Sequence, residues 1–375
     1  MNFETYPFEK LNNLLQDITP CEDYTALSLT IGEPQFETPL FIQQELQNAS
    51  ELLNKYPKTA GEMELRDAMR IYMQDRFGVE LQNSELIPTF GTREVLFNFP
   101  QFLLHDVEDA LMVFPNPFYQ IYEGAAKASR AKVVYLNLTK ENDFTPTIDE
   151  ETLAQANLVI LNTPNNPTSS TMSLEQMQEW VELALKYDFV LLNDECYADL
   201  YLNEPTPSLL NASIKAGNSE FKNVLVINSI SKRSSAPGLR SGFIAGDRDI
   251  LKEYMTYRTY VGCASPLPLQ KAAAKAWSDS EHVELFREKY IANFQIAKEI
   301  LGINPPEATF YIWLEVGDEI EFTKKLYKDY NLKVIPGSFL GREGIGKGYV
   351  RLALVYEAEI TKEALTRVKL ALESE

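Results

Sequence analysis

The fold is decided by residues 158–197, which read LVILNTPNNPTSSTMSLEQMQEWVELALKYDFVLLNDECY. Residues 158–161 and 189–192 are apolar runs with the length and the side chains of buried strands. Between them, residues 173–176 (SLEQ) form a capping-box pattern that opens an amphipathic helix. One face of this helix is expected to join the core and carries Met177, Trp180, Val181, Ala184 and Leu185. A strand, a helix and a second strand in this order predict a βαβ unit with parallel strands.

The same alternation of short apolar runs and helical patterns extends over about residues 90–250. We expect strands there at 110–114, 133–136, 158–162, 189–193, 224–228 and 242–245. The sequence therefore predicts an α/β fold in which a mostly parallel central sheet belongs to a large domain, residues 37–280.

The two ends of the chain have a different pattern. The C-terminal part is expected to form a helix at 286–301, strands at 309–316 and 349–354, and a closing helix at 361–372. This order predicts a smaller α+β domain over residues 281–375. Residues 1–36 are polar, aromatic and rich in turn formers, so we expect an N-terminal arm that packs on the smaller domain and forms part of it.

The charge of the chain restricts its partners. Of its 375 residues, 35 are Lys or Arg and 54 are Asp or Glu, which gives a formal net charge of −19. This surplus repels phosphate backbones and anionic membranes, so we expect neither nucleic acid nor a membrane as a partner. Any anionic ligand has to be held by a local basic pocket.

Other features bear on location and on metals. The apolar runs are strand-sized and fall short of the roughly 20 residues that a membrane span needs, and residues 1–10 lack the basic and apolar regions of a signal peptide. The 3 cysteines are scattered and form no CxxC pair, and His105 and His282 lie far apart. We therefore expect a cytoplasmic protein without a disulfide framework or a metal site.

Residues 228–240, NSISKRSSAPGLR, gather phosphate-binding groups around one lysine directly after a predicted strand. The hydroxyls of Ser229 and Ser231 and the fork of Arg240 suit a phosphate dianion. In a low-dielectric setting beside other cations, the pKa of Lys232 can fall enough for its amine to attack carbonyls. Taken alone, the segment also fits a solvated basic loop.

Two further strand ends carry polar side chains. Asp194 lies at the carboxyl end of a predicted strand, where open α/β sheets bind ligands, and it can pair with a protonated ring nitrogen. Asn166 precedes a proline, which extends its backbone and lets the amide reach into a cleft. Taken singly, Asp194 also fits a helix cap or a turn, and Asn166 a turn.

Two more segments suit anions. Residues 91–94 (GTRE) precede a helical pattern that starts near Val95, so free backbone N–H groups can hold phosphate there, although the glycine also fits a simple turn. Arg351 lies among apolar residues on a predicted strand, where an unpaired charge would be costly. A carboxylate ligand explains it, and a structural salt bridge is the alternative.

In their order along nearly the whole chain, these segments resemble the fold-type I pyridoxal-phosphate enzymes of aminotransferase class I/II. The resemblance implies the cofactor pyridoxal 5'-phosphate, with Lys232 forming the internal aldimine and Asp194 pairing with the pyridine nitrogen. It also implies that Tyr197 and Asn166 bind the phenolic oxygen of the ring and that Tyr119 stacks on the ring. The phosphate ligands that it implies are Ser229, Ser231, Arg240, Gly91, Thr92 and Arg93.

The resemblance extends to the substrate and to the assembly. Arg351 matches the arginine that grips the substrate α-carboxylate, Asn166 lies beside it, and Gly32 matches a residue that closes over the carboxylate. Tyr56 matches a tyrosine that reaches the phosphate of the neighbouring subunit, which implies a homodimer with shared active sites. One departure is Ser169, where the family usually has glycine; it alters the turn after Asn166 without removing a reacting group.

The implied reaction is a ping-pong transfer of an amino group from glutamate to an oxo acid. Arg93 stands where bacterial relatives of the aspartate aminotransferase type carry a basic residue that faces a distal carboxylate. With segments 231–234 (SKRS) and 237–242 (PGLRSG), the chain is most similar to the succinyldiaminopimelate aminotransferases of lysine biosynthesis. This implies N-succinyl-2-amino-6-oxopimelate as the acceptor.

Three alternatives stay open. An aspartate or broad-range aminotransferase would use the same residues, and kinetics with aspartate and with a succinylated substrate separates the two. A pyridoxal-phosphate C–S lyase of the same fold would release pyruvate and sulfide from cystathionine. A non-enzymatic binding protein would not need Lys232, Asp194, Tyr197, Asn166 and Arg351 together.

Overall fold

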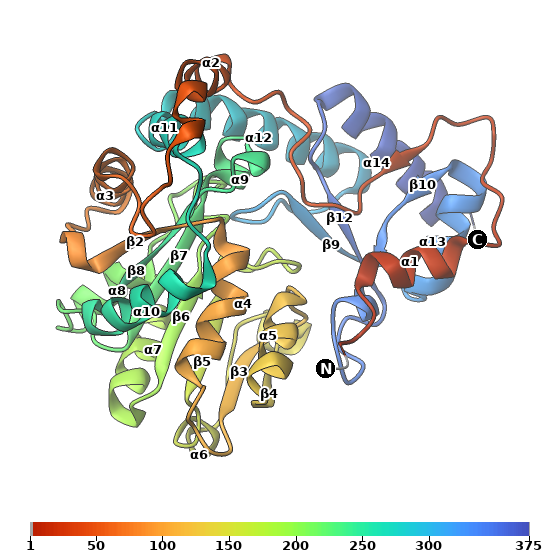
Figure 1. Cartoon of the computed structure of the whole chain (residues 1–375). Helices are drawn as coiled ribbons and strands as arrows, with labels where there is room; N and C mark the ends of the chain where they lie inside the picture. The colour runs from red at the N-terminus through yellow and green to blue at the C-terminus, as the bar shows by residue number, and fades with distance from the viewer. Residues whose placement is uncertain (1–2, 375) are drawn as a thin grey trace.

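A computed structural model describes residues 3–374. Its centre is a 7-stranded sheet in the order β2-β8-β7-β6-β5-β3-β4 (Figure 1). The strands are β2 (Leu86–Thr89), β3 (Leu111–Asn116), β4 (Lys132–Asn137), β5 (Leu158–Asn162), β6 (Val190–Asp194), β7 (Val224–Ser229) and β8 (Gly242–Gly246). Among the described strands of this sheet, only β8 runs in the direction opposite to all the others. The prediction of an α/β fold with a mostly parallel central sheet is thereby confirmed.

The strands predicted between residues 110 and 245 all exist, with ends that move by one or two residues. β2 was not predicted, since its sequence, Leu-Ile-Pro-Thr, is short and contains a proline. Its proline is tolerated because β2 lies at the edge of the sheet, where one side has no strand to bond.

Helices cover both faces of the sheet, since successive side chains of a buried strand point to opposite sides. Leu191, on β6, joins one core with Val181 of α7, whereas the next residue, Leu192, joins another core with Leu96 of α4. The first face is covered by α3 (Met63–Phe77), α7 (Leu174–Tyr187), α8 (Leu209–Lys215) and α11 (Leu267–Trp277). The second is covered by α4 (Thr92–Leu103), α5 (Ile121–Ser129) and α10 (Arg248–Val261). Short α6 (Glu150–Leu153) and α9 (Ile230–Arg233) lie in the connections.

The helix predicted between the two deciding strands is α7, and it has the predicted N-terminal cap and the predicted buried face. The Ser173 side chain accepts from the backbone N–H of Gln176, and the reciprocal bond completes the capping box. Met177, Trp180, Val181 and Ala184 are buried and Leu185 is partly buried.

A second, 3-stranded sheet has the order β11-β12-β9 and is antiparallel. It contains β9 (Tyr311–Glu315), β11 (Ile335–Pro336) and β12 (Tyr349–Ala353), and it packs with α12 (Glu281–Leu301), α13 (Glu319–Tyr330) and α14 (Ala358–Glu373). The expected strand at 309–316 is shorter because Thr309 has φ 77°, which no strand residue adopts. The helices expected at 286–301 and 361–372 begin five and three residues earlier, respectively.

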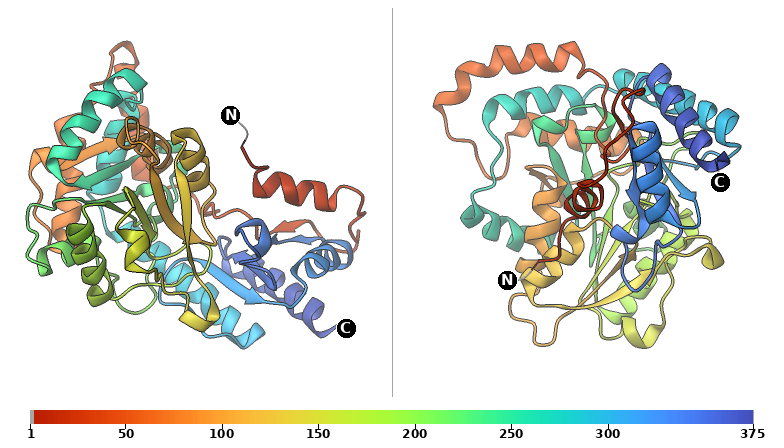
Figure 2. Two further views of the ribbon diagram at one scale, coloured as in Figure 1. Left: turned by 90° about the horizontal axis from the view of Figure 1, so that it is seen from below. Right: turned by 90° about the vertical axis from the view of Figure 1, so that its right-hand side faces the viewer.

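The N-terminal residues return to this smaller part of the molecule. β1 (Leu27–Ser28) pairs in parallel with β10 (Leu332–Lys333). This segment also contains α1 (Pro7–Leu15), a helix that was not predicted, which begins at a proline and buries Leu11 and Leu15 one turn apart. Figure 2 shows α1 beside the C-terminal elements, where it contacts β11 and α13. α2 (Leu40–Asn48) instead packs on α11.

We propose on this basis a small domain of residues 1–36 and 281–375 and a large domain of residues 37–280. Separate apolar cores in the two sheets support the division. Between residues 3 and 374, no helix combines the length and the apolar character needed to cross a membrane.

Candidate active site

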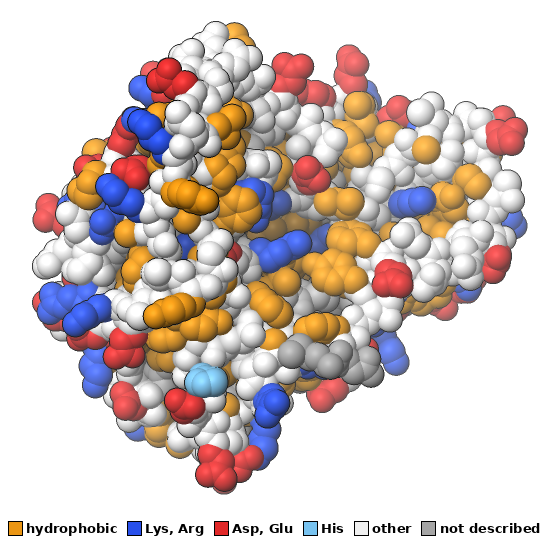
Figure 3. Space-filling model, in the orientation of Figure 1, with side chains coloured by type: hydrophobic (Ala, Val, Ile, Leu, Met, Phe, Trp, Pro, Cys, Tyr) orange, Lys and Arg blue, Asp and Glu red, His pale blue; other side chains and the backbone are white. Residues whose placement is uncertain are grey.

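Parallel strands β5, β6 and β7 end at one edge of the large sheet, and a cavity of about 820 Å³ opens there toward the smaller sheet. Figure 3 shows basic side chains gathered in the hollow between the two parts of the molecule. Most residues that the sequence singled out line this cavity: Gly32, Thr92, Arg93, Tyr119, Asn166, Asp194, Tyr197, Ser229, Ser231, Lys232, Arg240 and Arg351. The edge of a parallel sheet thus collects residues that lie up to about 320 positions apart in the chain.

Lys232 lies on α9, directly after β7. Ser229 caps this short helix by accepting from the N–H of Ser231, which turns the chain sharply at the end of the strand. The Lys232 amine donates to the carbonyl of Gly32. The pKa of Lys232 is lowered to about 8, mainly because its charged form loses contact with water. The guanidinium groups of Arg351 and Arg240 act in the same direction, and the Cys196 thiol and the Glu33 carboxylate oppose them.

Asp194 ends β6 and is buried. Its carboxylate accepts from the hydroxyl of Tyr122 at 3.0 Å and from the backbone N–H of Cys196 at 3.2 Å. Burial raises the pKa of Asp194, while these two bonds and the charge of Lys232 favour the ionised form. Tyr122 was missed by the sequence analysis because a tyrosine on the buried face of a helix looks like any core aromatic residue.

Asn166 and Arg351 meet across the cavity from different sheets. Arg351 Nη1 donates to Asn166 Oδ1 at 2.8 Å, and its Nη2 donates to the carbonyl of Thr30. Its buried Nε has no partner within residues 3–374. The guanidinium lies 4.5 Å from the ring of Tyr311, whose hydroxyl is 3.0 Å from that of Tyr197. Arg351 therefore has no carboxylate partner among the described side chains.

Tyr311 was also missed by the sequence analysis, although it forms one wall of the cavity. A side chain at Gly32 would collide with the Tyr311 hydroxyl, so that glycine is needed for close packing here. The only sequence signal for Tyr311 was its place in a predicted strand of aromatic character.

Hydroxyl, guanidinium and backbone N–H groups converge at one end of the cavity. Ser229 Oγ donates to Ser231 Oγ at 2.8 Å. Gly91 has φ 74° and precedes α4, whose first turn has no side-chain cap in the described structure. A Cβ atom at Gly91 would lie 2.5 Å from a guanidinium nitrogen of Arg240, so a larger residue would displace that guanidinium, and the φ of 74° also favours glycine. These groups together form a cradle for an anion.

A buried ion pair fixes the start of α4. Arg258 donates to the two carboxylate oxygens of Glu94 at 2.8 and 3.0 Å, and one of these oxygens also accepts from the backbone N–H of Phe90. Neither member of the pair was singled out from the sequence, because Glu94 and Arg258 are 164 residues apart. The pair holds the turn at Gly91 in place.

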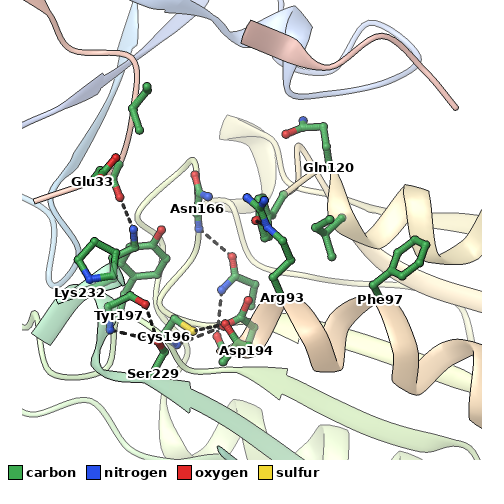
Figure 4. A pocket seen from close by; sticks show the side chains of 18 of the residues that line it. Glu33, Arg93, Phe97, Gln120, Asn166, Asp194, Cys196, Tyr197, Ser229 and Lys232 are labelled. Atoms are coloured by element: carbon green, nitrogen blue, oxygen red, sulfur yellow. Dashed lines mark hydrogen bonds between the residues drawn. The ribbon is translucent and has the colours of Figure 1, made fainter. Parts of the chain in front are cut away.

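Arg93 extends from the first turn of α4 into the cavity. Figure 4 shows it between Asn166 and Phe97. Its Nε donates to the hydroxyl of Tyr119 at 2.8 Å. Arg93 thus lines the cavity, and within residues 3–374 only its Nε makes a hydrogen bond.

Tyr56 is not brought to this site. Its side chain is 100% exposed and lies outside the residues that line the cavity.

The residues present fit pyridoxal phosphate. The Gly91 turn, the Ser229 and Ser231 hydroxyls and Arg240 supply donors for a phosphate dianion. The lowered pKa of Lys232 suits an amine that attacks the cofactor aldehyde. The buried carboxylate of Asp194 suits the protonated pyridine nitrogen.

Comparisons with known proteins agree with this geometry. The crystal structure of the aminotransferase AspB from Helicobacter pylori has a TM-score of 0.98, is 52% identical in sequence, and covers 100% of both chains. An LL-diaminopimelate aminotransferase from Maridesulfovibrio salexigens is 28% identical over 97% of this chain and 95% of the relative. An aspartate aminotransferase from Pyrococcus horikoshii is 29% identical over 98% of this chain and 95% of the relative.

Residues 24–368 match the family described as Aminotransferase class I and II. Members of this family depend on pyridoxal phosphate. The chain therefore belongs to the class I and II aminotransferases and is a pyridoxal-phosphate-dependent enzyme.

Proposed function

We propose that this enzyme transfers an amino group from glutamate to an oxo acid in a ping-pong cycle, with Lys232 as the central catalytic residue. The observation that carries the proposal is a half-buried lysine with a pKa of about 8 that shares one cavity with the buried carboxylate of Asp194. When bound, the cofactor supplies an electron sink that stabilises negative charge at the substrate α-carbon.

Lys232 moves the proton in this proposal. An amine accepts the α-proton of a substrate only in its neutral form. With a pKa of about 8, roughly a tenth of the amine is neutral at pH 7, whereas an ordinary lysine has less than about 0.1%. The ammonium form then gives up this proton within the same half-reaction, so that Lys232 ends the half-reaction as a neutral amine again.

The other cavity residues hold the cofactor. Asp194 would pair with the protonated pyridine nitrogen, and its bonds from Tyr122 and Cys196 favour the ionised carboxylate that this pairing needs. Tyr197 and Asn166 would bind the phenolic oxygen, and Tyr119 would pack against the ring. The phosphate would be held by Ser229, Ser231, Arg240 and the backbone N–H groups of Thr92 and Arg93 after Gly91.

Arg351 holds the substrate α-carboxylate together with Asn166. The buried guanidinium has bonds to an amide and a carbonyl but to no described carboxylate, so its charge is unbalanced. A bidentate carboxylate balances that charge. Gly32 closes the cavity over it.

The distal part of the substrate is placed beside Arg93, and we propose N-succinyl-2-amino-6-oxopimelate as the acceptor. Its succinyl carboxylate would pair with the Arg93 guanidinium. Relatives named for LL-diaminopimelate and for aspartate support a substrate with a second carboxylate, since both amino acids carry one. The latter name also supports the second candidate, an aspartate or broad-range aminotransferase.

A homodimer with shared sites is proposed from the surface near Tyr56. Large apolar side chains are exposed there: Leu40, Leu53, Tyr56, Met63 and Tyr260. The segments that carry them adjoin, since Arg258 donates to the carbonyl of Thr59 at 3.3 Å and α2 contacts the turn of helix at Ala49–Asn54. Such a patch is suited to a second copy of the chain.

We also propose a cytoplasmic location. Cys21, Cys196 and Cys263 are all free thiols, which suits a reducing compartment.

The pH dependence of cofactor capture tests Lys232. Because the neutral amine attacks the aldehyde, we expect the rate at which the apoenzyme binds pyridoxal phosphate to rise with pH and to level off above a pKa of about 8. The rate is followed by stopped-flow absorbance, with Lys232→Ala as the variant that forms no Schiff base with the cofactor. A rate that keeps rising to about pH 10, as for an ordinary lysine, would contradict the assignment.

Half-reaction titrations test the substrate. The visible band of the holoenzyme is followed while glutamate, aspartate or N-succinyl-LL-diaminopimelate is added. We expect glutamate and the succinylated amino acid to convert the cofactor and aspartate to act poorly. Conversion by aspartate and glutamate alone would favour the second candidate.

Arg93→Ala is expected to weaken kcat/KM for the succinylated substrate by roughly 10- to 100-fold, the value of a lost charge-assisted bond, and to leave alanine as a substrate unaffected. Arg93→Lys keeps the charge and is the matched control. If Arg93→Ala keeps the wild-type selectivity for acidic over neutral substrates, Arg93 does not bind the distal carboxylate.

Light scattering tests the assembly. We expect a mass of twice the 42.7 kDa chain, and loss of the dimer in the double variant Leu53→Glu/Tyr260→Glu. Leu285→Glu on α12, also at an exposed leucine, is the control and should keep the dimer.

Tyr56→Phe should keep the dimer but raise the Kd of the cofactor by about tenfold or more. A monomeric wild-type protein with full activity would refute the shared site.

A further inference from the structure

Ser169 lies in the turn that follows Asn166, at a position where the family usually has glycine. It is buried and has φ 64°, a conformation that favours glycine. Its hydroxyl is 2.5 Å from Thr309 Oγ1 and donates to the carbonyl of Tyr311 at 2.9 Å. A serine thus adds to this turn two bonds that glycine cannot make.

The directions of these hydrogen bonds follow from the number of hydrogens available. The Tyr311 backbone N–H donates to Thr309 Oγ1 at 3.0 Å. Because the Ser169 hydrogen goes to the Tyr311 carbonyl, the hydrogen between the two hydroxyls must come from Thr309. The three residues form a closed ring of hydrogen bonds, in which each hydroxyl donates once and accepts once.

The ring also explains an unusual backbone at Thr309. This residue is fully buried and has φ 77°, which is costly for a β-branched side chain. Its hydroxyl is used twice in the ring, and its N–H donates to the carbonyl of Leu200. A strained conformation persists where such contacts over-determine it, and these sites cluster where positioning matters.

The ring joins the Asn166 turn of the large domain to β9 of the small domain. A second link between the same two parts is the bond from Arg351 to Asn166. Tyr311 connects the two links, since its backbone belongs to the ring while its side chain packs on Arg351 and meets the Tyr197 hydroxyl. Position 169 is therefore coupled to the pair that would receive the α-carboxylate.

We propose that Ser169 is a positioning residue that acts through Thr309 and Tyr311 to hold Asn166 and Arg351 in register for the substrate α-carboxylate. The inference rests on the proposed role of Arg351. In this proposal Ser169, which stands where the family usually has glycine, helps to bind the amino acid substrate without touching it.

The test compares Ser169→Gly, which keeps the backbone conformation and removes the hydroxyl, with Thr309→Val, which removes the partner hydroxyl at similar size. Each holoenzyme is titrated with glutamate for its Kd, and kcat and KM are measured separately. We expect Kd and KM to rise by roughly tenfold in both variants, the effect of one buried hydrogen bond, with kcat within about threefold and an unchanged cofactor Kd.

Two further variants make the test specific. Thr309→Ser retains the hydroxyl, so its KM should stay within about twofold of the wild-type value. If Ser169→Gly does not fold, the comparison of Thr309→Ser with Thr309→Val still tests the inference. The double variant Ser169→Gly/Thr309→Val should bind glutamate no more weakly than the weaker-binding single variant, because both changes break the same ring of hydrogen bonds.

The inference is overturned if the single variants lower the melting temperature without changing the glutamate Kd, or if their effects on Kd simply add. Arg351→Ala separates this failure from that of the proposed function. If Arg351→Ala leaves the glutamate Kd unchanged, the carboxylate assignment is wrong. If Arg351→Ala weakens binding and Ser169→Gly does not, only the role of Ser169 fails.

Discussion

Three adjacent parallel strands that end at one edge of a buried sheet are the constraint on which this active site depends. β5, β6 and β7 are hydrogen-bonded side by side, and their carboxyl ends lead directly to Asn166, Asp194 and Lys232. Apolar cores on both faces of the sheet fix the register of these strands, so no functional side chain has to organise the site by itself. A shift of one residue in any strand would turn its end away from the cavity.

Burial by this scaffold acts on the two ionisable groups in opposite ways. It raises the pKa of Asp194 and lowers that of Lys232, so each neutral form is favoured. Hydrogen bonds from Tyr122 and from the Cys196 N–H partly offset the rise for Asp194, whereas the cationic neighbours Arg351 and Arg240 add to the fall for Lys232. The pKa values of the two groups are thereby brought closer together within a single cavity.

Much of this could be predicted from sequence because the deciding signals are local. Alternating apolar runs located the strands, and Lys232 and Asp194 follow two of them directly. Tyr122, Tyr311 and the pair of Glu94 with Arg258 could not be found in this way. Their partners are distant in the chain, and a buried polar group on a helix or strand has no periodicity of its own. The backbone of Thr309 is likewise set by tertiary hydrogen bonds rather than by its own preference, which is extended.

The most direct test of the central claim is to reduce the holoenzyme with borohydride, digest it, and locate the cofactor by mass spectrometry. Reduction fixes the cofactor to the amine that holds it. We expect the added mass on the peptide that contains Lys232 and on no other peptide. Attachment to a different lysine, or no attachment in a protein that carries out amino transfer, would contradict the account of this site.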